Sequence, residues 1–155
     1  MSPVIRHPPS DYMQRALALA SAQLGQTWPN PAVGAVVVSP QGKVLGQAAT
    51  AKGGRPHAET QALAQAGELV RGATLYVTLE PCSFHGKTPP CVEAIITSGI
   101  RECIIACEDP HPQVSGAGIA ALRDAGINVS VGLCSKEALA INSGFFSVVQ
   151  RGRPY

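Results

Sequence analysis

The chain has 155 residues, of which 45% are hydrophobic and 14% are charged, and its formal net charge is +2. This length suits one compact domain with a substantial core, and the apolar composition argues against a disordered chain. The twelve Lys and Arg residues are scattered without a basic stripe, which disfavours a large nucleic-acid interface. The sequence shows no signal peptide and no apolar run of transmembrane length. We therefore expect a single domain spanning 1–155 in the cytoplasm, where its five cysteines serve a metal or catalysis rather than a disulfide framework.

Hydrophobic periodicity predicts helices and strands that alternate along most of the chain. The first helix is expected to run to about Leu24, with Ser10 or Asp11 as its cap. Strands at 33–39 and 43–49 then form a hairpin. The later elements, in chain order, are a helix at 57–66, a strand at 73–79, a helix at 90–98, a strand at 102–107, a helix ending near 125, a strand at 127–132 and a helix at 135–143. This order is typical of a three-layer α/β/α domain with a mixed, mostly parallel sheet.

Two motifs place metal-binding side chains beside neighbouring elements. His57 and Glu59 stand in RPHAETQAL at a predicted helix start, and Cys82 and Cys91 stand in LEPCSFHGKTPPC after the next strand. Loops that follow parallel strands meet at one edge of the sheet, where ligands bind. One imidazole and two thiolates form a three-ligand zinc set with an open position for water, whose pKa zinc lowers. Glu59 is then the expected general acid/base for hydrolytic deamination of a heteroaromatic ring.

Each of these features also has a structural interpretation. A His-x-Glu at a helix start is common, and two cysteines in one loop can be a redox pair or small buried residues. The combination of both motifs favours a catalytic zinc site. Cys103, Cys107 and Cys134 lie in or next to apolar strands, and we expect them to be core residues. The Ser-Gly-Ala-Gly run at 115–118 opens a helix, where it could bind an anion or simply cap the helix.

The runs PNPAVGAVVV, PHAETQAL, GATLYVTLEPCS, GKTPPC and DPHPQVSGAGI extend over most of the chain. In these runs the sequence resembles the deaminase domain of the bacterial riboflavin-biosynthesis deaminase/reductase, in the cytidine-deaminase-like superfamily. Eight residues separate Cys82 from Cys91, as in that family, whereas cytidine and tRNA adenosine deaminases have a short Pro-Cys-x-x-Cys. The resemblance implies zinc on His57, Cys82 and Cys91, with Glu59 as the proton shuttle. It also implies deamination of 2,5-diamino-6-ribosylamino-4(3H)-pyrimidinone 5′-phosphate.

The resemblance further implies a set of substrate contacts. Asn30 matches an asparagine that hydrogen-bonds the pyrimidine, and Lys87 and Asp109 match substrate-contacting residues. His111 stands where relatives often have asparagine, and we include it among the substrate-binding candidates. Each has a structural alternative, since Asn30 between two prolines suits a turn, Lys87 suits a solvated loop, and Asp109 suits a turn cap.

Several positions depart from the family pattern. Many relatives carry histidine in place of Thr50 and of Phe84, and Arg or Lys in place of Ala117. Such differences bear on substrate recognition rather than on the metal. The family usually continues into an NADPH-dependent reductase domain. Because no Gly-x-Gly-x-x-Gly follows a strand, we expect no reductase domain within 1–155.

The sequence thus predicts a zinc deaminase of a small pyrimidine ribotide, without nucleic-acid or membrane partners, and a homodimer or higher homo-oligomer. Three alternatives remain open. The first is a zinc deaminase of another amino-heterocycle, such as a pterin, guanine or related purine. The second is a catalytically silent, zinc-stabilised binding domain. The third is a nucleic-acid editor, which the scattered basic residues disfavour.

Overall fold

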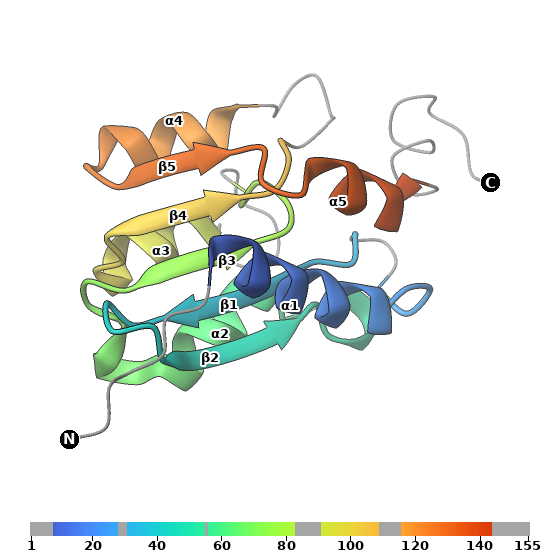
Figure 1. The fold of residues 1–155 in the computed structure, drawn as a ribbon, viewed down its shortest axis with the longest axis horizontal. Coiled ribbons are helices and arrows are strands. Elements are labelled where there is room, and N and C mark those ends of the chain that lie inside the picture. Colours follow the sequence, from blue (N-terminus) through green and yellow to red (C-terminus); the bar gives the residue numbers. More distant parts are fainter. Residues whose placement is uncertain (1–7, 28–30, 55, 83–90, 109–115, 144–155) are drawn as a thin grey trace.

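A computed structural model describes residues 8–27, 31–54, 56–82, 91–108 and 116–143. Five strands form one sheet in the order β2-β1-β3-β4-β5 (Figure 1). The strands are β1 (Gly34–Val38), β2 (Val44–Ala49), β3 (Thr74–Val77), β4 (Glu102–Ile105) and β5 (Asn128–Val131). The helices are α1 (Pro9–Ala22), α2 (Ala58–Ala66), α3 (Cys91–Ser98), α4 (Ala117–Asp124) and α5 (Ser135–Ile141), with short 3-10 turns η1 (Lys52–Gly54) and η2 (Gly67–Val70).

The sheet is mixed, as predicted. β1 pairs antiparallel with both β2 and β3, whereas β3, β4 and β5 are parallel, so two of the four pairings between described strands are parallel. Because β1 runs against β3, its amino end lies beside the carboxyl ends of β2, β3, β4 and β5. Every segment that leaves β2, β3 or β4 therefore begins at one edge of the sheet, which becomes the candidate site.

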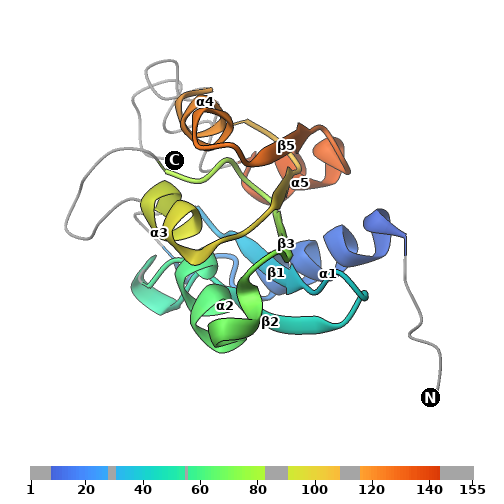
Figure 2. The ribbon, with the colours of Figure 1, turned by 90° about the vertical axis from the view of Figure 1, so that its left-hand side faces the viewer.

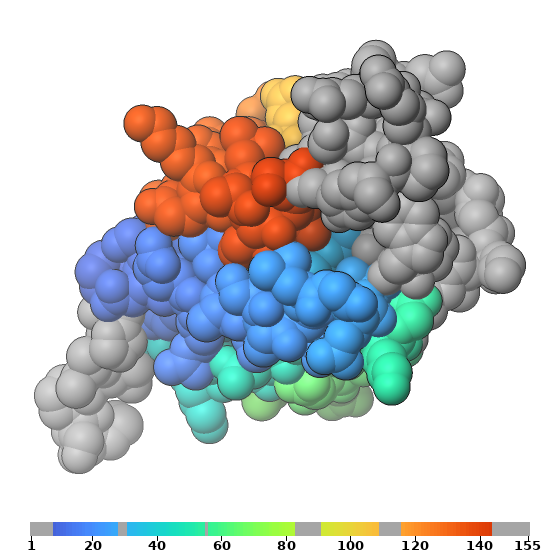
Figure 3. All heavy atoms as spheres, turned by 90° about the vertical axis from the view of Figure 1, so that its right-hand side faces the viewer, coloured from blue at the N-terminus to red at the C-terminus, as the bar shows by residue number. Residues whose placement is uncertain are grey.

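Helices cover both faces of the sheet and make the predicted three layers. α1 and α5 lie on one face, and α2, α3 and α4 lie in a row on the other (Figure 2). Figure 3 shows α5 packed directly against α1. All five residues of β1 are buried, as expected of a strand covered on both faces. At its start, a Cβ on Gly34 would overlap the carbonyl oxygen of Ala16, so glycine permits the close approach of α1.

The boundary of the first helix differs from the prediction. α1 begins at Pro9 with Pro8 as its N-cap, and no side chain caps it, so Ser10 and Asp11 were the wrong caps. Proline suits the first helical position because its missing N–H has no partner there. The helix ends at Ala22, and Leu24 lies beyond it with 47% of its surface exposed.

The three cysteines outside the zinc motif were predicted to be core residues. Cys103 and Cys107 are buried, which confirms the prediction for them. Cys134 is only half-buried, at the N-cap of α5 with a φ of 60°, and its Sγ accepts a hydrogen bond from Gln14 Nε2 at 3.6 Å. Its strand ends at Val131, so Cys134 stands in the connection to α5 rather than in the sheet. No helix in the described part of the chain is both long and apolar enough to cross a membrane.

Candidate active site

Three predicted ligands converge at the carboxyl edge of the sheet. His57 is the N-cap residue of α2, Cys91 is the first residue of α3, and Cys82 follows β3. The Nδ1 atom of His57 lies 3.1 Å from Cys91 Sγ and 3.9 Å from Cys82 Sγ. Cys82 Sγ also accepts a hydrogen bond of 3.2 Å from the backbone N–H of Cys91. Ligand atoms from three separate elements thus face one point.

The separations between these atoms fit a zinc ion. The nitrogen and the two sulfurs all lie within 4.8 Å of one another. Tetrahedral zinc, with usual Zn–N and Zn–S bond lengths, requires an N–S separation of about 3.6 Å. The two observed N–S distances lie on either side of that value, so small side-chain adjustments would seat the ion. An imidazole with two thiolates is also a donor set that zinc prefers.

The two thiols have opposite pKa shifts. Hydrogen bonding from the Cys91 thiol, assisted by His57 and the Cys91 backbone N–H, lowers the pKa of Cys82 to about 4 despite its partial burial. The pKa of Cys91 is raised, because its thiol donates to Cys82, because it is buried, and because Glu59 and Cys82 bring negative charge nearby. The protein alone therefore favours one thiolate and one thiol. A divalent cation would stabilise both thiolates.

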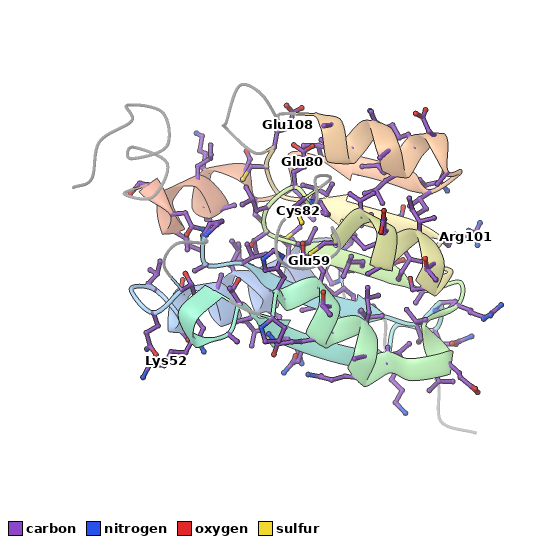
Figure 4. The ribbon with its side chains drawn as sticks, turned by 180° about the vertical axis from the view of Figure 1, so that it is seen from behind. Lys52, Glu59, Glu80, Cys82, Arg101 and Glu108 are labelled. Carbon is purple, nitrogen blue, oxygen red and sulfur yellow. The ribbon has the colours of Figure 1, made fainter. Side chains whose placement is uncertain are left out.

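Glu59 lies in the first turn of α2, and only 4% of its surface is exposed. Burial raises the pKa of its carboxyl to about 7, with a smaller contribution from the Cys82 charge, while its own backbone N–H, His57 and Cys91 act in the opposite direction. A carboxyl with this pKa can accept and donate a proton near neutral pH. Figure 4 shows Glu59, Cys82 and Glu80 at the same end of the helical layer.

Glu80 is a buried carboxylate that the sequence did not single out. It lies two residues before Cys82, and 5% of its surface is exposed. Its Oε1 accepts a hydrogen bond from the N–H of Gly116 at 3.0 Å, and its Oε2 accepts from Gly118 and Ile119 at 2.8 and 3.2 Å. Three N–H groups at the start of α4 are therefore bonded to a carboxylate from within the chain. Of the two interpretations of the Ser-Gly-Ala-Gly run, the structure favours capping.

The segment at 31–33, which enters β1, is fixed at the same edge by two buried polar side chains. Thr50 Oγ1 accepts from the N–H of Val33 at 3.0 Å, and its hydroxyl lies 3.3 Å from the Pro31 carbonyl oxygen as a donor. Asn142 accepts from the N–H of Ala32 at 2.8 Å and donates to the Ala32 carbonyl at 2.6 Å. Thr50, one of the family departures, is 1% exposed, so its side chain supports the backbone.

The structure does not describe the residues that were predicted to contact the substrate. Asn30, Lys87, Asp109 and His111 fall outside the residues that the structure describes, as does Phe84. Ala117, another departure, is exposed at the start of α4. A sequence signal for Glu80 did exist, in an acidic residue at the end of an apolar strand directly before Pro81. Without the fold, its partners 36 to 39 residues later could not be identified.

Comparisons with known proteins place this geometry in a family. The cytidine and deoxycytidylate deaminase zinc-binding region matches residues 7–107. The riboflavin biosynthesis protein RibD of Aquifex aeolicus is 53% identical over 152 residues, which make up 98% of this chain and 42% of that protein. The diaminohydroxyphosphoribosylamino-pyrimidine deaminase of Buchnera aphidicola is 49% identical over 143 residues, or 92% of this chain and 97% of that protein.

A solved structure agrees with the sequence relatives. RibD of Acinetobacter baumannii superposes with a TM-score of 0.89 and 45% identity, over 94% of this chain and 41% of that one. The chain thus spans less than half the length of the RibD proteins that it matches. Fold, ligand set and relatives agree that the chain belongs to the zinc-binding cytidine and deoxycytidylate deaminase family, in its riboflavin-biosynthesis branch.

Proposed function

We propose that this chain hydrolyses the 2-amino group of 2,5-diamino-6-ribosylamino-4(3H)-pyrimidinone 5′-phosphate, releasing ammonia and 5-amino-6-ribosylaminouracil 5′-phosphate. The observation that carries the proposal is the cluster of His57, Cys82 and Cys91 ligand atoms within 4.8 Å of one another, together with the buried Glu59 in the first turn of α2. The Buchnera relative supports this substrate, because its name specifies such a pyrimidine and the match covers 97% of its length.

The residues divide the chemistry between them. His57, Cys82 and Cys91 would hold a zinc ion, which supplies a Lewis acid that activates water for attack near neutral pH. Glu59 would take the first proton from the attacking water and deliver it to the ring nitrogen beside C2. It would then take the remaining proton from the new C2 hydroxyl group and deliver it to the departing amine, which leaves as ammonia. Its pKa of about 7 suits both directions of transfer. The charge of a bound cation would shift that pKa downward and favour the carboxylate, which is the form that can accept a proton.

Recognition of the substrate is proposed for the four residues that the family resemblance indicates. Asn30 would bond the pyrimidine ring, Lys87 would suit the phosphate or ribose, and Asp109 and His111 would complete the set. The enzyme would act on a free small molecule in the cytoplasm, where reducing conditions keep both zinc-binding thiols available. We further propose that the protein forms a homo-oligomer and has no nucleic-acid or membrane partner.

The test is ammonia release from this ribotide by purified, zinc-loaded protein, compared with Glu59→Gln. The variant keeps the shape of the side chain but cannot accept a proton, so turnover should fall about 100-fold or more. Zinc content should be unchanged, because Glu59 is not among the ligands. Glu93→Gln is the matched control, since Glu93 is an exposed carboxylate in the first turn of the neighbouring helix α3. It should retain the parent rate.

Other results would identify the alternatives. Release of ammonia from a pterin, guanine or related purine, but not from the ribotide, would move the proposal to another heterocycle. Zinc binding with no turnover on any amino-heterocycle would indicate a silent binding domain. A parent protein that does not bind zinc would remove the basis of the proposal.

A further inference from the structure

We propose that Glu80 is a positioning residue for the zinc site, which fixes the segment carrying Cys82 against the start of α4. The inference rests on the proposed function in one respect, because it takes Cys82 to be a zinc ligand. Glu80 itself contacts backbone N–H groups of α4, so its effect on the metal would pass through Pro81 and Cys82.

The first observation is the completeness of the hydrogen bonding around Glu80. Three backbone N–H groups, of Gly116, Gly118 and Ile119, donate to its two carboxylate oxygens at 2.8 to 3.2 Å. The negative charge also lies at the positive end of the α4 dipole. Such charge-assisted bonds are stronger than neutral ones, so this buried side chain holds one position.

The second observation is independent of the charge and concerns the contact beside it. Gly118 lies so close to the Glu80–Pro81 segment that an added Cβ would overlap the Pro81 carbonyl oxygen and press on the Glu80 side chain. Pro81 is among the fully buried side chains. Glycine at 118 therefore allows α4 to contact the backbone directly before Cys82.

The third observation is that Cys82 is held from both sides. Before it, the N–H of Glu80 donates to the Cys107 carbonyl at 3.0 Å, which continues the pairing with the β4 side of the sheet. At Cys82 itself, the carbonyl accepts from Val92 at 3.1 Å and Sγ accepts from Cys91 at 3.2 Å, both in the first turn of α3. Glu80 would add the α4 attachment, leaving Pro81 as the only residue between that anchor and the ligand.

This arrangement predicts an effect on zinc affinity as well as on stability. Groups that orient metal ligands from outside the coordination sphere typically contribute 10–100-fold to metal affinity, and we expect about tenfold here, since other bonds to Cys82 remain. Glu80→Gln keeps the shape of the side chain. Its NH2 group, however, would replace an oxygen that accepts from a backbone N–H, so two donors would face each other. Gly118→Ala alters the same contact from the other side, and alanine has the higher helix propensity, so a loss cannot be ascribed to weaker helix formation.

The experiment measures zinc affinity by competition with a chromophoric chelator, and unfolding of the metal-free proteins by urea. Both variants should bind zinc about tenfold more weakly than the parent. With Co²⁺ in place of zinc, the thiolate-to-metal absorption band should shift in both. The double variant should lose less affinity than the product of the single losses, because both changes act on one contact. Glu137→Gln, which removes an exposed carboxylate from the first turn of α5, should leave zinc affinity and the Co²⁺ spectrum unchanged.

One outcome would overturn the inference. If the folded variants were less stable but bound zinc as the parent does, Glu80 would be a cap of α4 and nothing more. If only Glu80→Gln weakened zinc binding, the result would support the role of Glu80 and assign it to the hydrogen bonds of the carboxylate rather than to the contact at Gly118. Should Glu80→Gln fail to fold, Gly118→Ala carries the test, because it leaves the carboxylate in place. Failure of the parent to bind zinc would instead count against the proposed function, so the two failures are distinguishable.

Discussion

Glu59 and Glu80 are two buried carboxyl groups at the same edge of the sheet, exposed to 4% and 5%, yet they are held in opposite ways. Glu80 receives three backbone N–H groups from the start of α4. Glu59 stands in the first turn of α2 with a pKa raised to about 7, mainly by burial. A buried carboxylate that accepts several backbone hydrogen bonds, such as Glu80, supports the fold. A buried carboxyl group whose burial outweighs its hydrogen bonds, such as Glu59, has a raised pKa and can exchange a proton. Burial alone therefore does not identify a catalytic acid. The hydrogen-bond partners of the carboxyl group distinguish a structural glutamate from a catalytic one.

The same contrast applies to the helix ends that meet at this edge. His57, the N-cap residue of α2, and Cys91, the first residue of α3, direct a nitrogen and a sulfur toward a shared point. The beginning of α4 is closed by Glu80, which lies in the segment that follows β3. A glycine-rich helix start binds an outside anion only when the chain does not supply one itself.

The largest effect in this comparison is expected for Glu80→Ala. Removing the carboxylate leaves three N–H donors without their acceptor, and an unsatisfied buried donor costs on the order of 1–3 kcal/mol. Because Gly116 is only partly buried and water can reach it, we expect a net loss of about 3 kcal/mol in the free energy of unfolding. Urea unfolding measures it. Added formate or acetate should restore part of the loss by entering the vacated position, and a loss below about 1 kcal/mol would show that these bonds are not needed.

A second prediction concerns Glu59 and has the opposite sign. In the metal-free protein its pKa is raised from 4.5 to about 7, so its contribution to stability is present below pH 4.5 and is lost as the pH rises through 7. Glutamine does not ionise, so Glu59→Gln removes this pH-dependent loss of stability. The variant should gain stability relative to the parent between pH 4.5 and pH 8, by up to about 3 kcal/mol.

The difference between parent and variant reports the ionisation of Glu59 together with its electrostatic interaction with Cys82 and Cys91. Urea unfolding at several pH values, with a chelator present, provides the measurement. If the parent and Glu59→Gln showed the same pH dependence, Glu59 would not carry a raised pKa, and its contrast with Glu80 would fail.

The sequence predicted the metal cluster more fully than its supports, for a physical reason. His57 and Cys91 lie at the beginnings of α2 and α3, and Cys82 lies in the segment after β3, so a combination of two short motifs was enough to predict the cluster. Alternating apolar runs also placed most of the helices and strands close to their observed bounds. Local patterns of this kind are visible in a short window of sequence.

The supports depend on contacts between distant segments, which no local pattern records. Thr50 looked like an altered pocket residue, but its hydroxyl accepts a hydrogen bond from the backbone N–H of Val33, in the segment that enters β1. Asn142 pairs with Ala32, 110 residues away. The prediction for the start of α1 was wrong for a different reason. Ser10 and Asp11 are residue types that favour the N-cap position, but the helix begins before them, with Pro8 as its N-cap.

The smallest effect is expected for Glu137→Gln, which completes the comparison with a carboxylate that is neither buried nor used in the site. Glu137 lies in the first turn of α5 and is exposed, so water already solvates its oxygens. Its interaction with the helix dipole is screened, and its loss should cost less than about 0.5 kcal/mol in the free energy of unfolding and less still at high salt. The three glutamates would then differ by what stabilises the carboxylate, which is a set of backbone donors at Glu80, water at Glu137, and too little of either at Glu59. A loss at Glu137 as large as at Glu80 would mean that the position at a helix start, and not the buried hydrogen bonds, determines the contribution.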